Sequence, residues 1–187
     1  MGKPEITEEM IFGCFAAAQQ ADSLEETASS FVDVEEYENK IMYPEFARWA
    51  KKVDRPDIAR IFARVAGEEG LHAHWLRELY ADMGTPERGE DTERAIEVLQ
   101  QIKENCDELF DINPEGVLEK ALAVAIRVEE REYQDIYPRF RDQALEKGDS
   151  KSAEVYQRVI DSERQHAEWF HAALSDYRQE IGVAASA

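Results

Sequence analysis

The sequence repeats itself at a fixed offset of 94 residues (128 minus 34). Residues 34–75 align without a gap with residues 128–169, and 15 of the 42 pairs are identical, whereas composition alone would give roughly three. The first copy reads VEEYENKIMYPEFARWA where the second reads VEEREYQDIYPRFRDQA, and further on VAGEEGLHAHW aligns with VIDSERQHAEW. This internal duplication predicts two structurally similar units in one chain.

Each copy has the sequence pattern of a helical hairpin. Apolar residues recur three and four positions apart, as between residues 58 and 65, which is typical of one buried helix face. Turns are indicated at residues 53–57 in the first copy and at 147–150 in the second. Pro44 and Pro138 lie at equivalent positions, and we expect each to bend its helix rather than end it.

The composition agrees with long helices and excludes several function classes. Only 9 Gly and 6 Pro interrupt the 187 residues, and 34% of the chain is charged, which favours helices over a sheet. The net charge of -19 makes nucleic acid an unsuitable partner. No apolar stretch approaches the ~18 residues of a membrane span, and the N-terminus lacks the apolar run of a signal peptide. We therefore expect a soluble, cytoplasmic protein with no membrane partner, and an organelle stays compatible with the sequence.

The two cysteines, Cys14 and Cys106, form no C-x-x-C pair. Zinc ribbons and rubredoxin-type iron sites need such paired spacing. The sequence therefore predicts neither, and we expect both cysteines to be packed thiols in a reducing compartment.

These features predict an all-α protein with one domain over residues 1–187, folded as a ferritin-like four-helix bundle of two duplicated hairpins. A connection that runs the length of the bundle is required between the hairpins of such a topology, and the amphipathic segment between the copies can supply it. The predicted parts are an accessory N-terminal helix at 7–22, a first hairpin at 29–84, a helical crossover with a short helix at 85–115 and a second hairpin at 116–181.

Four short motifs place metal-binding side chains three residues apart. They are Glu35-x-x-Glu38, Glu69-x-x-His72, Glu129-x-x-Glu132 and Glu163-x-x-His166. Residues three apart share a helix face. The two motifs of the first copy are centred on position 53.5 and those of the second on 147.5, inside the predicted turns. Each hairpin therefore brings its two motifs level, and the duplication lets all eight side chains converge. A motif of this form means little alone, since Glu168-x-x-His171 also occurs but does not repeat.

The repeated acids have two structural alternatives, a solvated stripe or salt bridges to Arg64 and Arg158. The motifs, however, lie beside apolar positions such as Val65 and Val159. Six ionised carboxylates in a bundle core would cost many kcal/mol unless multivalent cations balanced them. Carboxylate and imidazole ligands without thiolate suit iron or manganese, and zinc could also bind. Eight ligands are too many for one ion, so the sequence predicts two, bridged by carboxylates.

The segment EEYENKIMYPEF, followed by EEGLH, resembles the rubrerythrin branch of the ferritin-like diiron proteins. The resemblance covers residues 34–75 and 128–169 and implies two iron ions, with manganese possible, and reduction of peroxide or dioxygen. Rubrerythrins carry a C-terminal rubredoxin domain that this chain lacks, so the resemblance implies an external electron donor such as rubredoxin. Rubrerythrins also have the extra glutamate in one half only. The glutamate pairs in both halves are closer to symerythrin and the rubredoxin-less erythrins.

The resemblance also implies roles for individual residues. The basic ligand set would be Glu35, Glu69, His72, Glu129, Glu163 and His166. Glu38 and Glu132 would be additional ligands. As a separate hypothesis, a carboxylate displaced from the metals would accept a proton during catalysis. Tyr43 and Tyr137 match a tyrosine that hydrogen-bonds a ligand carboxylate, although both could be plain core aromatics.

Three other functions use the same ligands. The chain could be a non-catalytic metal store or structural metal bundle, a manganese catalase, or an oxygenase with an organic substrate. A further hypothesis concerns self-modification, because an oxidising metal pair could link Phe15 to Val128, which directly precedes Glu129. Simple core packing of Phe15 and Val128 is the alternative.

Overall fold

The computed structural model describes residues 3–19, 31–82 and 107–185. All regular secondary structure within these ranges is helical. Within the same ranges, no helix combines the length and the apolar character needed to cross a membrane. The predicted all-α fold class is confirmed.

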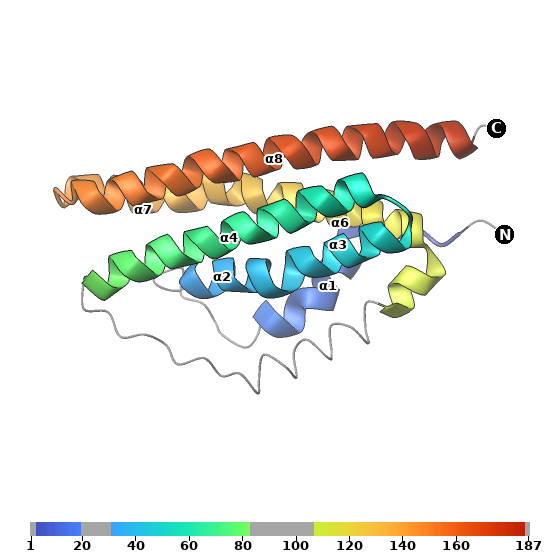
Figure 1. Ribbon diagram of the computed structural model, residues 1–187, viewed down its shortest axis with the longest axis horizontal. Coiled ribbons are helices and arrows are strands. Elements are labelled where there is room, and N and C mark those ends of the chain that lie inside the picture. Colours follow the sequence, from blue (N-terminus) through green and yellow to red (C-terminus); the bar gives the residue numbers. More distant parts are fainter. Residues whose placement is uncertain (1–2, 20–30, 83–106, 186–187) are drawn as a thin grey trace.

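Four long helical segments form the bundle. The first consists of α2 (Phe31–Tyr37), a π-helical turn η2 (Glu38–Met42) and α3 (Tyr43–Lys52). The second is α4 (Pro56–Asp82). The third consists of α6 (Pro114–Arg131), a π-helical turn η3 (Glu132–Ile136) and α7 (Tyr137–Glu146), and the fourth is α8 (Ser150–Ala185). Figure 1 shows them running side by side along the long axis of the molecule.

The two hairpins turn at equivalent residues, by the same helix-ending motif. Asp54 and Gly148, 94 positions apart, both have positive φ, 59° and 73°. The next amide bonds back across the helix end, from Arg55 N to the carbonyl of Ala50 in the first hairpin. Asp149 N bonds the carbonyl of Ala144 in the second. This bond pattern, with a left-handed residue after the helix, is a Schellman motif. The turns lie at opposite ends of the bundle (Figure 1), as expected for a pseudo-twofold.

Each helix continues through its proline, as predicted, by widening into a π-helical turn. The amide of Tyr43 bonds the carbonyl of Glu38, and the amide of Tyr137 bonds that of Glu132, five residues earlier in both cases. Proline cannot donate a backbone hydrogen bond, and its ring crowds the carbonyl of the preceding turn. The wider turn directly before Tyr-Pro accommodates both effects. Such single turns occur frequently at functional sites.

The hairpins pack against each other through α4 with α8 and α3 with α6. An additional helix, α1 (Glu8–Gln19), packs on α6 and buries Ile11 and Cys14 in the core. Residues 20–22 of the predicted 7–22 helix lie outside the described residues. So does most of the predicted 85–115 crossover, together with Cys106. Its described end contains a helical stretch at 107–112 that leads into α6.

The core consists of two apolar clusters that the ligand motifs separate. One cluster contains Tyr43, Phe46, Trp49, Phe62 and Phe170 among others, and the other contains Phe31, Tyr137, Phe140, Tyr156 and Val159 among others. Along α4 and α8 alike, residues of one cluster precede the Glu-x-x-His motif and residues of the other follow it. The motifs therefore lie in a polar layer enclosed on both sides by packed apolar side chains.

Candidate metal centre

All eight side chains of the four motifs are buried between the helices. Six are fully inaccessible, and Glu38 and Glu132 are only 3% and 4% exposed. The four motifs come from α2 with η2, from α4, from α6 with η3 and from α8, one from each long segment of the bundle. The structure thus brings together residues that span more than 130 positions of sequence.

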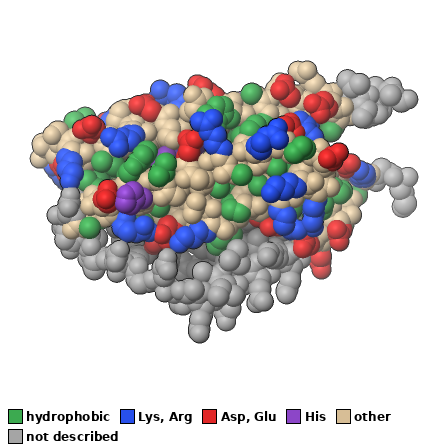
Figure 2. Space-filling model, in the orientation of Figure 1, with side chains coloured by type: hydrophobic (Ala, Val, Ile, Leu, Met, Phe, Trp, Pro, Cys, Tyr) green, Lys and Arg blue, Asp and Glu red, His purple; other side chains and the backbone are tan. Residues whose placement is uncertain are grey.

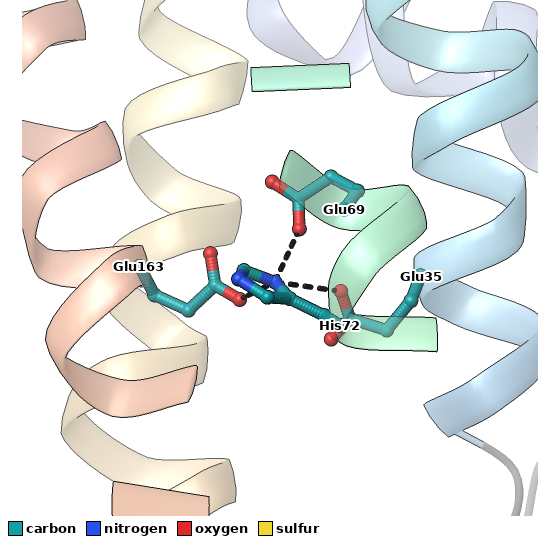
Figure 3. A group of neighbouring side chains, drawn as sticks. All are labelled: Glu35, Glu69, His72 and Glu163. Carbon is teal, nitrogen blue, oxygen red and sulfur yellow. Dashed lines mark hydrogen bonds and ion pairs between the residues drawn. The ribbon is translucent and has the colours of Figure 1, made fainter. Parts of the chain in front are cut away.

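The first metal group consists of Glu35, Glu69, His72 and Glu163, which converge from three helices in Figure 3. Nδ1 of His72 lies 3.2 Å from Oε2 of Glu35, 2.7 Å from Oε2 of Glu69 and 2.8 Å from Oε1 of Glu163. One ring nitrogen can donate a single hydrogen bond at most. One N–H cannot serve three carboxylate oxygens, and a metal ion bound by the nitrogen and the three oxygens would satisfy all four groups.

The second metal group consists of Glu69, Glu129, Glu163 and His166. Nδ1 of His166 lies 3.0 Å from Oε1 of Glu69, 3.2 Å from Oε2 of Glu129 and 3.0 Å from Oε2 of Glu163. This is the pseudo-twofold copy of the first group. In each group, one potential ligand atom from every residue lies within 4.8 Å of the others.

Glu69 and Glu163 belong to both metal groups and offer a different oxygen to each. Oε2 of Glu69 faces His72 and Oε1 faces His166, while Glu163 presents Oε1 to His72 and Oε2 to His166. Both oxygens of Glu69 are buried and lack a hydrogen bond from any described residue. A carboxylate that presents one oxygen to each of two groups is the arrangement of a bridging ligand in a two-metal site. The residues present therefore fit a pair of metal ions.

Two tyrosines hydrogen-bond the glutamates that belong to one group only. The hydroxyl of Tyr137 donates to Oε1 of Glu35, and the hydroxyl of Tyr43 donates to Oε1 of Glu129. Each tyrosine thus binds a carboxylate of the other repeat and leaves Oε2 for the metal group. Hydrogen bonds of this kind fix the orientation of metal ligands.

Glu38 and Glu132 lie beside the two groups but in neither of them. Each begins a π-helical turn, and each has one buried carboxylate oxygen without a hydrogen bond from any described residue. Burial first, and then the charge of Glu132, raise the pKa of Glu38 well above its ordinary value. Glu132 has a raised pKa as well, through burial first and then the charges of Glu35 and Glu163. Their predicted role as ligands stays a prediction.

The protein itself does not balance the negative charge of the site. Burial, followed by the charge of Glu163, raises the pKa of Glu35, and the same two causes in the same order raise that of Glu129. Burial alone would lower the pKa of His72, but the charges of Glu163 and Glu69 raise it well above its ordinary value. Carboxyls and imidazoles thus hold extra protons when no metal is bound.

The two structural alternatives do not describe this site. Within residues 3–19, 31–82 and 107–185, no Lys or Arg forms an ion pair with any of the six motif carboxylates. Arg64 pairs instead with Glu68, and Arg158 lies over the ring of Trp75. The face drawn in Figure 2 shows acidic and basic side chains interspersed over the surface. The buried acids are therefore separate from the solvated charge of the chain.

The histidines outside the motifs lie at the surface. His74 and His171 are more than half exposed and contact Glu78 and Glu130. The structure does not describe the position of the Phe15 side chain, while Val128 is partly buried against the core. The hypothesis of a Phe15–Val128 link therefore stays a prediction.

The sequence analysis missed the residues that pack against the two histidines. Trp75 packs on the ring of His72 and Trp169 on that of His166, at 5.5 and 5.7 Å between ring centroids. Glu68 contacts the outer nitrogen of His166. The repeat alignment already contains the signal, because both tryptophans match between the copies and position 68 does not.

Comparison of the whole chain with known proteins confirms the resemblance to the rubrerythrin family. The rubrerythrin family model matches residues 3–80 and 34–174. The overlap of these two matches is expected for a chain with an internal repeat. Symerythrin from Cyanophora paradoxa is 33% identical over 162 residues, which are 87% of this chain and 88% of that protein. The crystal structure of symerythrin from Cyanophora paradoxa, reduced with dithionite, aligns with a TM-score of 0.67 and 32% identity over 80% of this chain and 82% of that one.

Proposed function

Because the chain belongs to the rubrerythrin family of diiron oxidoreductases, we propose that it binds two iron ions and reduces hydrogen peroxide or dioxygen. An external donor such as rubredoxin would supply the electrons. The observation that carries the proposal is the bridging position of Glu69 and Glu163, each of which presents one oxygen to each metal group. The same two residues would hold both ions, with Glu35 and His72 on one side and Glu129 and His166 on the other.

The composition of the site supports a pair of redox-active metal ions. Oxygen and imidazole ligands without thiolate suit iron or manganese. Six carboxylates carry six negative charges, so two ferrous ions would leave a net charge of -2 and two ferric ions would leave zero. A buried site favours the neutral combination. The ligand set therefore favours the oxidised pair and makes the reduced pair a good electron donor to an O–O bond.

When bound, the iron pair supplies two electrons, which together with two protons convert one hydrogen peroxide to two water molecules. The protons have to come from the protein side of the site. Glu38 and Glu132 each keep a buried oxygen without a hydrogen bond from any described residue, one helical turn from Glu35 and Glu129. A positioned carboxyl can hold and deliver a proton in this way. Tyr43 and Tyr137 keep Glu129 and Glu35 in place while the proton moves.

The test is anaerobic loading with ferrous iron followed by rapid mixing with peroxide or with dioxygen. We expect two iron ions per chain and oxidation at least ten times faster than for ferrous iron free in solution. Glu163→Gln removes a bridging charge and should abolish the fast phase. Glu168→Gln is the matched control, because Glu168 lies on the same helix but is exposed. Turnover is then measured with reduced rubredoxin as the electron donor.

The other candidate functions give different results in the same experiment. A metal store or structural site would bind metal without fast oxidation by either oxidant. A manganese catalase would be active with manganese alone and would release dioxygen from peroxide without a donor. In an oxygenase, dioxygen would rapidly oxidise the bound iron, but the electron donor would be consumed only when an organic substrate is present. Iron oxidation no faster than in solution would contradict the proposal.

A further inference from the structure

The two metal groups have matching ligands but differ around their histidines. Nε2 of His166, the ring nitrogen that points away from the metal group, lies 3.0 Å from Oε2 of Glu68. Glu68 is on α4, next to the bridging Glu69, and its other oxygen lies 2.8 Å from Nε of Arg64. Arg64 in turn lies over the ring of Trp169, 3.9 Å from the ring centroid, and Trp169 packs on His166. These four side chains form one closed cluster.

The other half of the repeat has three of the four members. His72, Trp75 and Arg158 stand 94 positions before or after His166, Trp169 and Arg64, and Arg158 lies 5.0 Å from the Trp75 ring centroid. The position that corresponds to Glu68, however, is Ser162. A serine side chain is too short to span from α8 to His72, and its hydroxyl lies instead 3.4 Å from Nε2 of His166 on its own helix.

His72 therefore lacks the contact that His166 has. Its Nε2 is buried and has no hydrogen-bond partner among the described residues. A ligand histidine commonly gives its second N–H to a carboxylate, which fixes the ring and its tautomer and makes the nitrogen on the metal a stronger donor. Only one of the two histidines receives this support.

We propose that Glu68 is a positioning residue that makes the two metal positions inequivalent. Glu68 accepts the Nε2 hydrogen of His166, so that Nδ1 faces Glu69, Glu129 and Glu163 as a lone pair. The second metal group therefore binds its ion more tightly than the first. This inference rests on the proposed two-metal site, and it concerns the difference between the two ions rather than the reaction.

The difference is measurable without turnover. Titration of the metal-free protein with ferrous iron against a competing chelator should show two binding steps whose affinities differ by about 10-fold or more. Mössbauer spectra of the ⁵⁷Fe-loaded, reduced protein should contain two quadrupole doublets of equal area. One doublet should be lost from samples loaded with a single equivalent, because the tighter position fills first.

Two variants assign the difference to Glu68. Glu68→Gln keeps an acceptor but removes the charge, and Glu68→Ala removes both. The tighter step should weaken progressively across the two, by about 10- to 100-fold in Glu68→Ala, so that the steps merge. Ser162→Glu restores a carboxylate opposite His72, where Arg158 can hold it, and should tighten the weaker step. Ser162→Glu also removes the weak contact between the Ser162 hydroxyl and His166, but the result that supports the inference is a gain in affinity at the His72 position, which a damaged fold would not produce.

Glu119→Gln is the matched control. Glu119 loses the same charge but pairs with Arg178 at the surface, away from both histidines. Equal affinities and a single doublet in the unmodified protein would overturn the inference, as would Glu68 variants that behave like Glu119→Gln. Two unequal ions in a protein that reduces neither oxidant would leave this inference standing and contradict the proposed function alone.

Discussion

Tyr43 and Tyr137 connect the two repeats at the level of single atoms. Each donates to a carboxylate that belongs to the other repeat and to one metal group only. Tyr43→Phe should therefore lower the affinity for the ion held by Glu129 and His166. The freed carboxylate of Glu129 can rotate, and its Oε1 loses a buried hydrogen-bond partner. We expect a loss of about 10-fold in metal affinity for that position, measured by chelator competition.

Tyr80→Phe is the control for this change. The hydroxyl of Tyr80 lies 3.0 Å from that of Tyr156 and contacts no motif residue. The substitution removes the same atom from a comparably buried tyrosine. Equal metal affinity in Tyr43→Phe and Tyr80→Phe would show that the tyrosine hydroxyl does not orient Glu129.

Glu38 and Glu132 allow ligand and proton-transfer roles to be separated. Glu38→Gln combined with Glu132→Gln keeps the size of both side chains and removes their acidic protons. We expect two irons per chain to remain and peroxide reduction to slow by about 10²- to 10⁴-fold, the usual contribution of a positioned acid or base. Iron content from metal analysis and single-turnover rates check the two halves of this prediction. Loss of one iron would identify the pair as necessary ligands, and an unchanged rate would exclude a proton-transfer role.

At the level of helices, the two repeats form the same hairpin turn with a different residue at the left-handed position. Asp54 and Gly148 both occupy the left-handed position after a helix, where only glycine is unstrained. Asp54→Gly should therefore stabilise the protein by about 0.5–1 kcal/mol, and Gly148→Ala should destabilise it by about 1 kcal/mol. A Cβ at Gly148 would have no other atom within 4 Å, so backbone strain alone is tested.

Chemical denaturation of the metal-free protein measures both free energies of unfolding. The two positions are far from the metal groups in sequence, at the ends of the hairpins, so metal affinity should not change. A stabilising effect of Gly148→Ala would contradict the left-handed geometry of the turn.

At the level of the whole molecule, the buried site makes stability depend on pH. As pH rises, the metal-free protein should lose stability, whereas the stabilisation that bound metal provides should grow. The pKa values of Glu35, Glu38, Glu129 and Glu132 are raised above 4.5 by burial and by neighbouring carboxylates. Between pH 4.5 and those raised values, the folded metal-free protein binds protons that the unfolded chain has released. Its stability must therefore fall as pH rises through this window.

The other shifted groups of the site do not reverse this trend. The pKa values of His72 and His166 are raised above 6.5, so their stabilising contribution is complete below pH 6.5 and is lost as pH rises through the folded values. Burial would raise the pKa of Glu163, but His72 and His166 lower it below 4.5. Its contribution is lost only when pH falls below 4.5, so it does not affect the range above.

We therefore expect the melting temperature of the metal-free protein to fall between pH 5 and pH 8. Metal ions displace these protons, so their affinity rises with pH and they stabilise the folded state most at pH 8. Thermal unfolding with excess metal or with chelator at pH 5, 6.5 and 8 checks both trends. A metal-free protein that gains stability towards pH 8 would contradict the buried carboxylates as the cause.

The sequence alone determined the fold and the residues that meet. A repeat with two motifs equidistant from each turn places all four motifs at one height in an antiparallel bundle, because helix geometry is regular and the turn sets the register. These spacings predicted the fold class and the convergence of six motif residues. They also predicted that the helices continue through Pro44 and Pro138. The C-terminal end of the predicted accessory helix and most of the crossover lie outside the described residues.

Only the tertiary structure decided which motif residues belong to which metal group and which neighbours contact them. Spacing gives the height of a side chain along a helix but not the direction of its outer atoms, which depends on packing between helices. Spacing therefore could not show that Glu69 and Glu163 each present an oxygen to both metal groups, whereas Glu38 and Glu132 lie outside both. It also could not show that Glu68 reaches across to His166, since that contact joins α4 to α8 over 98 residues (166 minus 68). Side-chain direction in a packed core is set by neighbours distant in sequence.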